Sequence, residues 1–458
     1  MTSRAKTRTA FFCTDCGNET PRWQGQCPAC DAWNTLVEEP RPPSSGRRRA
    51  GAVAPASDRR PPRRLGEVEA DADAGRWLTT IGDFDHVLGG GIVPGSLVLI
   101  GGEPGIGKST LLLQVAAHLS AGGRPVLYVS GEESALQVRL RADRLSEPTD
   151  EVTILETTAL EAVLEEAASL RPDILFVDSV QTVHVAELES AAGSVGQVRE
   201  CAARLQRFAK ETGTAVFLVG HVTKGGGIAG PKTLEHIVDT VLYFEGAPAQ
   251  DHRILRTTKN RFGGSDELGV FRMSDSGLHV VENPSALFLS ARGRPVPGSA
   301  VTAGIEGTRP LLVEVQALVA RASYGAPQRV AAGLDPKRLA LLLAVLEKRA
   351  GRSFSQLDVF INVVGGLRLR ETGADLAVCA ALLSSAADRP LPSDAVFLGE
   401  VGLGGEIRRV SQTDRRLAEA ARMGFQTAFL APGGNAPESG VTRHGVEDLH
   451  ALAGRLFS

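Results

Sequence analysis

Short apolar runs alternate with amphipathic segments from residue 77 onward. Apolar runs bounded by turn residues are typical of buried strands, and apolar residues spaced three or four apart are typical of helices. We interpret residues 96–100, 125–130, 173–178 and 214–220 as strands and residues 108–119 as a helix. Strands that alternate with helices predict a mainly parallel sheet with helices on both faces. The fold class is therefore α/β.

The pattern changes near residue 286. A strand-like run at residues 311–319 is followed by a helical pattern near 337–349 and a strand at 358–364. A chain of 458 residues with 43% hydrophobic residues is globular and too long for a single hydrophobic core. We therefore expect an α/β domain at residues 77–285 and a second, α+β domain at residues 286–458.

The part of the chain before the α/β domain has a different composition. Pro, Gly, Ser, Ala and Arg dominate residues 36–76, which predicts a flexible basic linker after a small domain at residues 1–35. Two interpretations stay open, an electrostatic tether for nucleic acid and a solvated spacer. The net charge of −3 gives no global sign of a polyanion partner, so such a partner must be judged from local patches.

Four of the six cysteines form two Cys-x-x-Cys pairs with ten residues between them. They are Cys13, Cys16, Cys27 and Cys30. Two such pairs suit tetrahedral Zn²⁺, and a closed shell of four thiolates is structural because it leaves no open coordination position. We expect this zinc ribbon to depend on its metal for folding. Cys201 and Cys379 stand alone in apolar helical patterns, and we expect both to be core residues.

The sequence predicts no membrane span. The longest purely apolar runs, residues 339–346 and 376–383, are far shorter than the roughly 20 residues that a spanning helix needs. The N-terminus has no apolar signal-peptide core. We therefore expect a cytoplasmic protein, and a reducing cytosol disfavours disulfide bonds between its cysteines.

A glycine-rich segment between the first strand and the helix at 108–119 has the spacing of a P-loop. It consists of Gly102, Glu103, Pro104, Gly105, Ile106, Gly107, Lys108 and Ser109, followed by Thr110. The glycines let backbone N–H groups approach phosphates at a helix N-terminus. Lys108 is expected to reach the β and γ oxygens, and Ser109 to ligate Mg²⁺. The sequence therefore predicts binding and hydrolysis of ATP.

Acidic residues follow two other predicted strands. Asp178 ends an apolar run and matches a Walker B strand, whose carboxylate holds Mg²⁺ directly or through water. Glu132 and Glu133 follow the strand at 125–130 and are the candidates for the base that polarises the attacking water, with Glu132 ahead of Glu133. The alternative is a solvated acidic pair at the start of a helix.

Two later segments carry cations. Thr223, Lys224 and Lys232 lie in a glycine-rich loop that can follow a phosphodiester backbone or form a mobile surface connection. Further on, five residues place two cations beside a turn. They are Lys259, Asn260, Arg261, Phe262 and Gly263.

The order of four-cysteine ribbon, P-loop, Walker B strand and Lys259-to-Gly263 motif resembles the bacterial RadA (Sms) family of recombination and repair ATPases. The resemblance implies a RecA-like core in a hexameric ring that acts on single-stranded and branched DNA and extends heteroduplex joints begun by RecA. It also implies that Lys259 and Arg261 reach the γ-phosphate of a neighbouring subunit. His221 resembles a position that relays phosphate state to DNA-binding loops, or is a structural strand-end imidazole.

Residues 286–458 resemble the Lon protease domain in a degenerate form. Gly373 occupies the position of the nucleophilic serine, and the position of the catalytic lysine falls at Asp414. A Ser-Lys dyad needs an oxygen nucleophile and a base, so we expect a scaffold and not a protease. The resemblance suggests a basic face for DNA, and the alternative is an ordinary solvated face. The candidate residues are Arg368, Arg370, Arg408, Arg409, Arg415 and Arg416.

The sequence leaves three functional hypotheses. The leading hypothesis is a DNA-stimulated ATPase motor that drives branch migration on recombination intermediates. The others are an ATP-driven peptidase with a zinc adaptor and a nucleotide-switched binding platform in which hydrolysis hardly matters. Trp23 and Trp33 in the zinc ribbon contact protein or DNA, or simply cover the small metal core.

Overall fold

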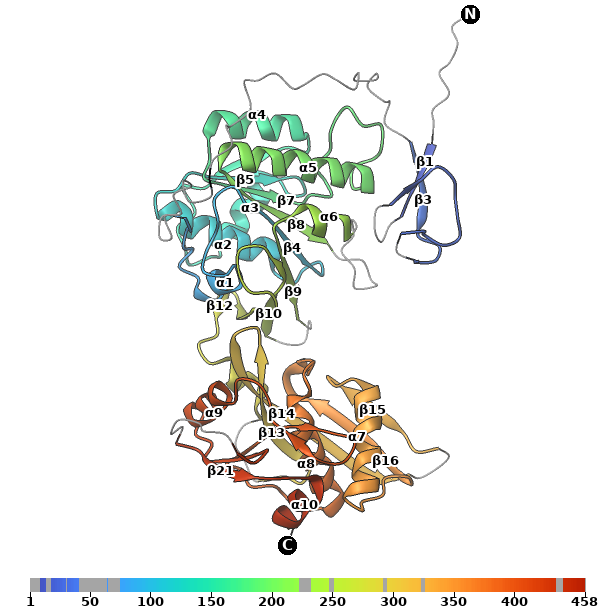
Figure 1. Ribbon diagram of the computed structural model, residues 1–458. Helices are drawn as coiled ribbons and strands as arrows, with labels where there is room; N and C mark the ends of the chain where they lie inside the picture. The colour runs from blue at the N-terminus through green and yellow to red at the C-terminus, as the bar shows by residue number, and fades with distance from the viewer. Residues whose placement is uncertain are drawn as a thin grey trace, which may run out of the picture. The chain divides into compact units, whose positions relative to one another are not determined.

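The computed structural model describes ten segments of the chain and divides it into two compact units. The described segments are residues 9–13, 18–29, 31–40, 64, 75–221, 232–246, 251–290, 295–322, 326–433 and 440–457. Unit 1 is Met1–Val281 and unit 2 is Glu282–Ser458. Figure 1 shows their helices and strands.

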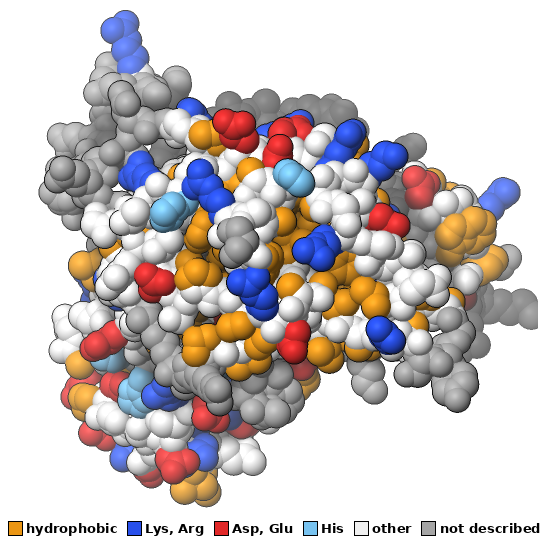
Figure 2. Space-filling model, turned by 90° about the horizontal axis from the view of Figure 1, so that it is seen from below, with side chains coloured by type: hydrophobic (Ala, Val, Ile, Leu, Met, Phe, Trp, Pro, Cys, Tyr) orange, Lys and Arg blue, Asp and Glu red, His pale blue; other side chains and the backbone are white. Residues whose placement is uncertain are grey.

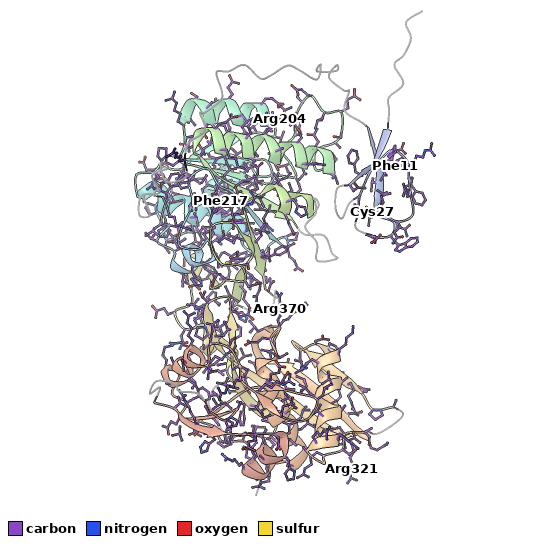
Figure 3. All side chains as sticks on the ribbon, viewed as in Figure 1. Phe11, Cys27, Arg204, Phe217, Arg321 and Arg370 are labelled. Carbon is purple, nitrogen blue, oxygen red and sulfur yellow. The ribbon has the colours of Figure 1, made fainter. Side chains whose placement is uncertain are left out.

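The N-terminal ribbon is a small antiparallel sheet. Its strands are β1 (Thr9–Cys13), β2 (Glu19–Thr20) and β3 (Leu36–Pro40), in the order β2-β1-β3. Cys13, Cys27 and Leu36 form its buried cluster, against which Phe11 packs. Figure 3 shows Phe11 and Cys27 on this ribbon. A core of this size is too small to stabilise a fold without a further crosslink or metal.

The rest of unit 1 is built on a nine-stranded sheet in the order β12-β11-β10-β9-β4-β8-β7-β5-β6. The six strands from β9 to β6 are parallel, and β10, β11 and β12 extend the sheet in antiparallel fashion. The strands are β4 (Leu97–Gly102), β5 (Val126–Ser130), β6 (Thr153–Glu156), β7 (Ile174–Asp178), β8 (Ala215–His221), β9 (Thr240–Glu245), β10 (His252–Asn260), β11 (Leu268–Ser274) and β12 (Gly277–Val280).

Helices cover both faces of this sheet, as the alternation of patterns predicts (Figure 1). On one face, Val98 and Ile100 of β4 belong to a cluster with apolar residues of the first three helices; on the other face, Leu97 and Leu99 pack with the next two. The helices are α1 (Gly82–Val87), α2 (Lys108–Ala121), α3 (Ala135–Ala142), α4 (Leu160–Leu170), α5 (Val195–Thr212) and α6 (Lys232–Ile237). Strands buried on both faces explain the nearly continuous apolar runs.

Unit 2 is a mixed α+β domain on a seven-stranded sheet in the order β15-β16-β14-β13-β17-β20-β21. The strands are β13 (Ser299–Glu306), β14 (Arg309–Arg321), β15 (Arg329–Ala332), β16 (Leu357–Val363), β17 (Ala395–Leu398), β20 (Thr427–Leu430) and β21 (Thr442–Gly445), with a hairpin of β18 (Glu400–Val401) and β19 (Ile407–Arg408). Its helices are α7 (Pro336–Arg349), α8 (Asp375–Ala387), α9 (Thr413–Arg422) and α10 (Leu449–Phe457), with short 3-10 turns at η3 (Pro284–Phe288), η4 (Val364–Gly366) and η5 (Thr372–Ala374).

Burial explains the apolar runs and the two isolated cysteines. Residues 376–383 are all buried inside α8, so this run belongs to a core helix. None of the helices in the described segments is long and apolar enough to cross a membrane. Cys201 and Cys379 have no exposed surface, which confirms them as core residues. Burial raises the pKa of the Cys201 thiol to about 12 and raises the pKa of Cys379 as well.

Candidate functional site

The P-loop joins the end of β4 to the start of α2. Gly102 has a φ of 156°, and a Cβ atom there would lie 2.7 Å from the carbonyl oxygen of Phe244. Gly107 has a φ of 114° and is the left-handed residue at which α2 begins. Both positions therefore require glycine, and the backbone N–H groups at the start of α2 stay accessible to an anion.

Lys108 is folded back onto this loop. Its Nζ donates hydrogen bonds to the carbonyl oxygens of Gly102 and Glu103, both at 2.9 Å, and the residue is only 4% exposed. Burial lowers the pKa of Lys108, and the negative charges of Asp178 and Glu132 partly oppose this shift. The carboxylates of Asp178 and Glu132, from two other strand ends, thus act on the lysine charge. A phosphate group is the kind of acceptor that can replace the two carbonyls.

Asp178 lies at the carboxyl end of β7, where it pairs in register with Ser130 at the end of β5. It is 8% exposed, and Tyr128 donates a hydrogen bond from its hydroxyl to Asp178 Oδ2 at 2.7 Å. Burial raises the pKa of Tyr128 well above its ordinary value, and the charge of Asp178 adds to the shift, so this hydroxyl stays protonated. Ser109, the second predicted magnesium ligand, is half-buried at the first turn of α2.

The two candidate bases have different surroundings. Glu132 is exposed, accepts a hydrogen bond from Ser179 Oγ on Oε1 at 2.5 Å, and its charge acts on Lys108. Glu133 forms an ion pair with Arg141 of α3 instead. The structure therefore brings Glu132, Asp178 and Lys108 together, whereas the Glu133 carboxylate is engaged by a neighbouring helix.

The Lys259-to-Gly263 motif lies at the opposite edge of the sheet from the P-loop. Asn260 at the end of β10 pairs with Thr240 at the start of β9, and Thr240 pairs with Val98 near the start of β4. The P-loop follows Gly102, which pairs with Phe244 at the other end of β9. The four residue-to-residue steps from Thr240 to Phe244 span about 13 Å. The Lys259-to-Gly263 motif and the P-loop therefore lie at opposite ends of the parallel strands.

At this opposite edge the motif is held by polar contacts. Lys259 Nζ donates to the carbonyl oxygens of Glu235 at 2.5 Å and Val238 at 2.8 Å, at the end of α6. Arg261 Nη1 lies 3.3 Å from Asp239 Oδ1, and its side chain is half exposed. Burial lowers the pKa of Lys259, and the charge of Arg261 lowers it further.

The other residues of the motif have structural contacts. Asn260 Nδ2 donates to the Leu88 carbonyl at 3.1 Å, and the Phe262 carbonyl accepts from Arg76 Nη2 at 2.6 Å. A Cβ atom at Gly263 would lie 2.9 Å from the Cα of Gly89. The motif is thus built against the glycine-rich turn that precedes the P-loop strand.

The predicted DNA contacts are only partly described. Thr223 and Lys224 lie outside the described residues, as do the side chains of Lys232, which begins α6, and of His221, which ends β8. Arg368 and Arg370 are exposed, and Figure 3 labels Arg370. On the face drawn in Figure 2, described Lys and Arg side chains are interspersed with acidic and apolar ones.

The prediction that Arg416 belongs to a basic face is wrong. Arg416 has no exposed surface, and its guanidinium binds both carboxylate oxygens of Glu371 at 2.6 Å and the Ser411 carbonyl at 2.9 Å. Charged residues usually form an exposed face, but the partner of Arg416 lies 45 residues away and is not visible in the local sequence. Arg408, Arg409 and Arg415 are exposed, and each has a hydrogen-bond partner in its own unit.

The same buried arginine borders Gly373. A Cβ atom at Gly373 would lie 3.4 Å from Arg416 Nη1, whereas Asp414 is exposed in the first turn of α9. Asp375 in the same segment is paired with Arg338. Arginine does not lose its proton in proteins, so neither it nor the glycine supplies the groups of a Ser-Lys dyad.

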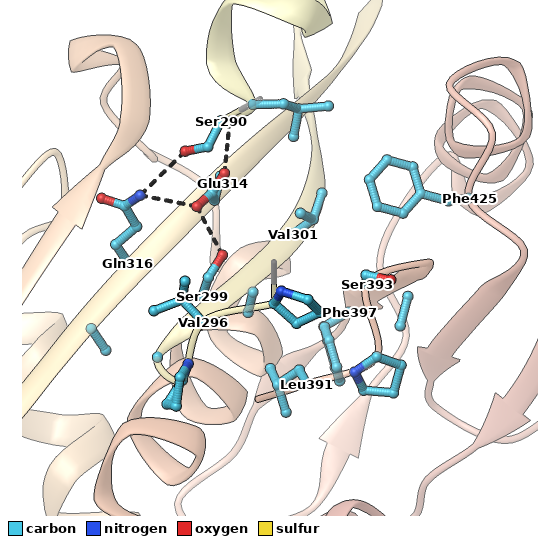
Figure 4. A pocket seen from close by; sticks show the side chains of 18 residues that line it. Ser290, Val296, Ser299, Val301, Glu314, Gln316, Leu391, Ser393, Phe397 and Phe425 are labelled. Carbon is cyan, nitrogen blue, oxygen red and sulfur yellow. Dashed lines mark hydrogen bonds between the residues drawn. The ribbon is translucent and has the colours of Figure 1, made fainter. Parts of the chain in front are cut away.

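A pocket of about 340 Å³ in unit 2 has no connection with the predicted chemistry. Its walls are largely apolar, and Figure 4 shows Val301, Phe397 and Phe425 around it. Glu314 lies at one side. Burial works against its charge, but hydrogen bonds from Gln316, Ser290 and Ser299 outweigh this and lower its pKa. These hydrogen bonds stabilise the charged carboxylate of Glu314, so no ligand is needed to explain it.

The ribbon brings together two of the four cysteines of the predicted zinc site. Cys13 and Cys27 are both fully buried in one cluster, and Cys16 and Cys30 lie outside the described residues. Two buried thiols from two Cys-x-x-Cys pairs, in a ribbon with hardly any apolar core, fit four-thiolate zinc binding. Trp23 and Trp33 are 56% and 69% exposed, so they do not serve mainly to cover this centre.

Three residues that matter for the geometry are not among the predicted catalytic and binding residues. Tyr128 was part of a predicted strand, Ser179 was only one polar residue at a strand end, and Asp239 was not singled out. A hydroxyl-bearing residue in an otherwise apolar core strand was the one available signal for Tyr128. The other two are defined by long-range pairing between strands.

These features define a class of protein: a P-loop ATPase with a RecA-like core, an N-terminal zinc ribbon and a C-terminal mixed-sheet domain. Family models agree, because an AAA domain matches residues 61–227 and a rubredoxin metal binding domain matches residues 11–38. Among solved structures, a KaiC-like protein from Pyrococcus horikoshii OT3 matches with a TM-score of 0.39 and 21% identity, over 45% of this chain and 98% of that chain.

Full-length relatives make the assignment specific. DNA repair protein RadA of Pseudomonas aeruginosa PAO1 is 51% identical, with 95% of each chain covered. The proteins of that name from Bacillus subtilis 168 and Escherichia coli K12 are 49% and 48% identical, covering 93% and 96% of this chain and 93% and 97% of theirs. The chain therefore belongs to the DNA repair protein RadA family.

Proposed function

We propose that this protein is a DNA-stimulated ATPase that drives branch migration on recombination intermediates during RecA-mediated strand exchange. It acts in the cytoplasm as a homo-hexameric ring on single-stranded and branched DNA. The observation that carries the proposal is the meeting of Lys108, Asp178 and Glu132 at one edge of the parallel sheet, because these are the groups that phosphoryl transfer to water requires.

Each group has a defined task in ATP hydrolysis. Lys108 exchanges its two carbonyl acceptors for the β and γ oxygens, which the backbone N–H groups of residues 105–110 also bind. Ser109 and Asp178 are the residues that hold Mg²⁺, which when bound neutralises charge on the phosphates. Glu132 is the base that orients and polarises the attacking water, and Glu133 is the weaker candidate because Arg141 engages it.

A second copy of the chain completes the site. Lys259 and Arg261 lie at the sheet edge remote from their own P-loop, so the charge that they add to a transferring phosphoryl group goes to the neighbour's nucleotide. Contacts of this head-to-tail kind close into a ring. His221, at the end of β8 beside the P-loop strand, is a candidate to transmit nucleotide state to the loop that follows it.

The remaining parts bind DNA and support the ring. Zn²⁺ held by Cys13, Cys16, Cys27 and Cys30 stabilises the ribbon. Thr223, Lys224 and Lys232 in the loop of unit 1, together with the exposed Arg368 and Arg370 of unit 2, are the candidate phosphate contacts. Contacts with phosphates give binding that is independent of sequence and sensitive to salt.

Two other functions receive less support. A peptidase lacks a nucleophile at Gly373 and a base at Asp414, and the Arg416–Glu371 pair occupies the space beside the glycine. A nucleotide-switched platform needs only binding. Glu132→Gln distinguishes it from a motor, because a switch keeps its function in cells without hydrolysis and a motor loses it.

The test is the rate of ATP hydrolysis with and without single-stranded and forked DNA. We expect DNA to raise the turnover of the wild-type protein and Lys108→Ala to abolish hydrolysis in both conditions. A turnover that no DNA changes, or one that persists in Lys108→Ala, would overturn the proposal.

A further inference from the structure

Two buried hydroxyl groups that belong to neither the P-loop nor the acidic residues hold the two carboxylates of the site. Ser179 has no exposed surface and donates to Glu132 Oε1 at 2.5 Å. Tyr128 is 1% exposed and donates to Asp178 Oδ2 at 2.7 Å. Each hydrogen bond fixes one oxygen of its carboxylate and thereby sets the direction in which the other oxygen points.

The turn that carries Glu132 is also fastened to the end of β7 by its backbone. The N–H of Gly131 donates to the Asp178 carbonyl at 2.8 Å, and Thr182 Oγ1 donates to the Ser179 carbonyl at 2.8 Å. A Cβ atom at Gly131 would lie 2.2 Å from Thr182 Oγ1, so the two segments approach as closely as glycine permits. The location of Glu132 is thus set by the strand that carries Asp178.

The need for such support differs between the two acids. Asp178 is almost buried, but Glu132 is exposed and its long side chain has several rotamers open to it. A base acts efficiently only when its oxygen is held within reach of the water, and small displacements cost large factors in rate. A rigid, buried hydroxyl is a suitable means of fixing one oxygen of Glu132.

We propose that Ser179 and Tyr128 are positioning residues of the ATPase site: Ser179 sets the geometry of Glu132 toward the attacking water, and Tyr128 sets the geometry of Asp178 toward Mg²⁺. The inference rests on the proposed function, because it needs Glu132 as the base and Asp178 as a metal ligand. Both hydroxyl groups act through a carboxylate.

A double-mutant cycle in the full-length protein tests Ser179. Ser179→Ala is expected to lower kcat about tenfold with little change in the KM for ATP. Adding Ser179→Ala to Glu132→Gln is expected to cost nothing further, because the serine acts only through that carboxylate. Losses that multiply in the double variant, or a change confined to KM, would overturn the role of Ser179.

Two further variants separate positioning from a loss of stability. Ser179→Thr keeps the hydroxyl and is expected to retain kcat within about threefold, so a threonine variant that folds but is as slow as the alanine variant contradicts the inference. Ser285→Ala is the matched control, because Ser285 is equally buried and donates to Glu419 at the same 2.5 Å, but in unit 2. It is expected to lower thermal stability and leave kcat unchanged.

Tyr128→Phe tests the proposed effect of Tyr128 on Mg²⁺ binding by Asp178. The Mg²⁺ concentration for half-maximal ATPase activity is expected to rise about tenfold, with kcat recovering at saturating Mg²⁺. An unchanged Mg²⁺ requirement would overturn the role of Tyr128. A wild-type protein without ATPase activity would overturn the proposed function as well, whereas an active wild type with multiplicative losses would remove only this inference.

Discussion

Lys108 and Lys259 occupy similar surroundings at opposite edges of one sheet. Each donates two hydrogen bonds to backbone carbonyls, and burial lowers the pKa of each. They differ in their neighbours: the charges that act on Lys108 are the carboxylates of Asp178 and Glu132, whereas Lys259 has a cation, Arg261, beside the carboxylates of Asp239 and Glu235. One edge thus holds the residues that we propose for phosphoryl transfer, and the other holds Lys259 and Arg261. In the proposed ring, contact between two copies would bring the two edges together.

Arg416 in unit 2 shows what a structural cation looks like in the same chain. It is fully buried and forms a bidentate salt bridge with Glu371. A lysine that donates to neutral carbonyls can change acceptor when a phosphate binds, whereas separating a buried guanidinium from its carboxylate has a large cost in free energy. Cations that donate to carbonyls are thus available for a ligand, and a cation paired with a buried carboxylate stabilises the fold.

The largest expected effect is at the P-loop edge. Lys108→Ala should reduce DNA-stimulated ATPase activity by about a thousandfold or more, because the cation that neutralises the β and γ oxygens is lost. Steady-state phosphate release measures this. Retention of even a tenth of the wild-type turnover by a folded Lys108→Ala protein would break the assignment of the two edges.

A smaller but still clear effect is expected at the other edge. Lys259→Ala should lower turnover by about a hundredfold, because a trans cation stabilises charge on the transferring phosphoryl group. Nucleotide binding measured with a fluorescent ATP analogue should change little. Arg309→Ala, an exchange of a cation in unit 2, serves as the control, and an equal loss in that variant would show that any lost cation has this effect.

The structural cation should affect stability and not catalysis. Arg416→Met leaves the Glu371 carboxylate without its cation and should lower the free energy of unfolding of unit 2 by about 3 kcal/mol. Denaturant unfolding measures the loss, and Arg415→Ala on the same helix, exposed at the surface, should change it by less than about 0.5 kcal/mol. A marked drop in kcat of folded Arg416→Met would contradict the distinction between the two kinds of cation.

Much of the fold and the centre of the site follow from local patterns. The apolar runs locate β4, β5, β7 and β8 to within two residues at either end, and the P-loop spacing identifies Lys108 and Ser109. Long-range pairing is not visible in such patterns. The register of β9 and β10, which separates Lys259 from its own P-loop, and the burial of Arg416 against Glu371 depend on segments far apart in sequence.

The proposed ATPase site is built from the two sheet edges of neighbouring copies, and mixing two inactive variants tests this arrangement most directly. Lys108→Ala supplies an intact Lys259, and Lys259→Ala supplies an intact P-loop. Equimolar co-assembly should restore DNA-stimulated ATP turnover to about a quarter of the wild-type rate, because about one interface in four then combines both intact halves. A mixture that stays as inactive as its components would contradict a shared site.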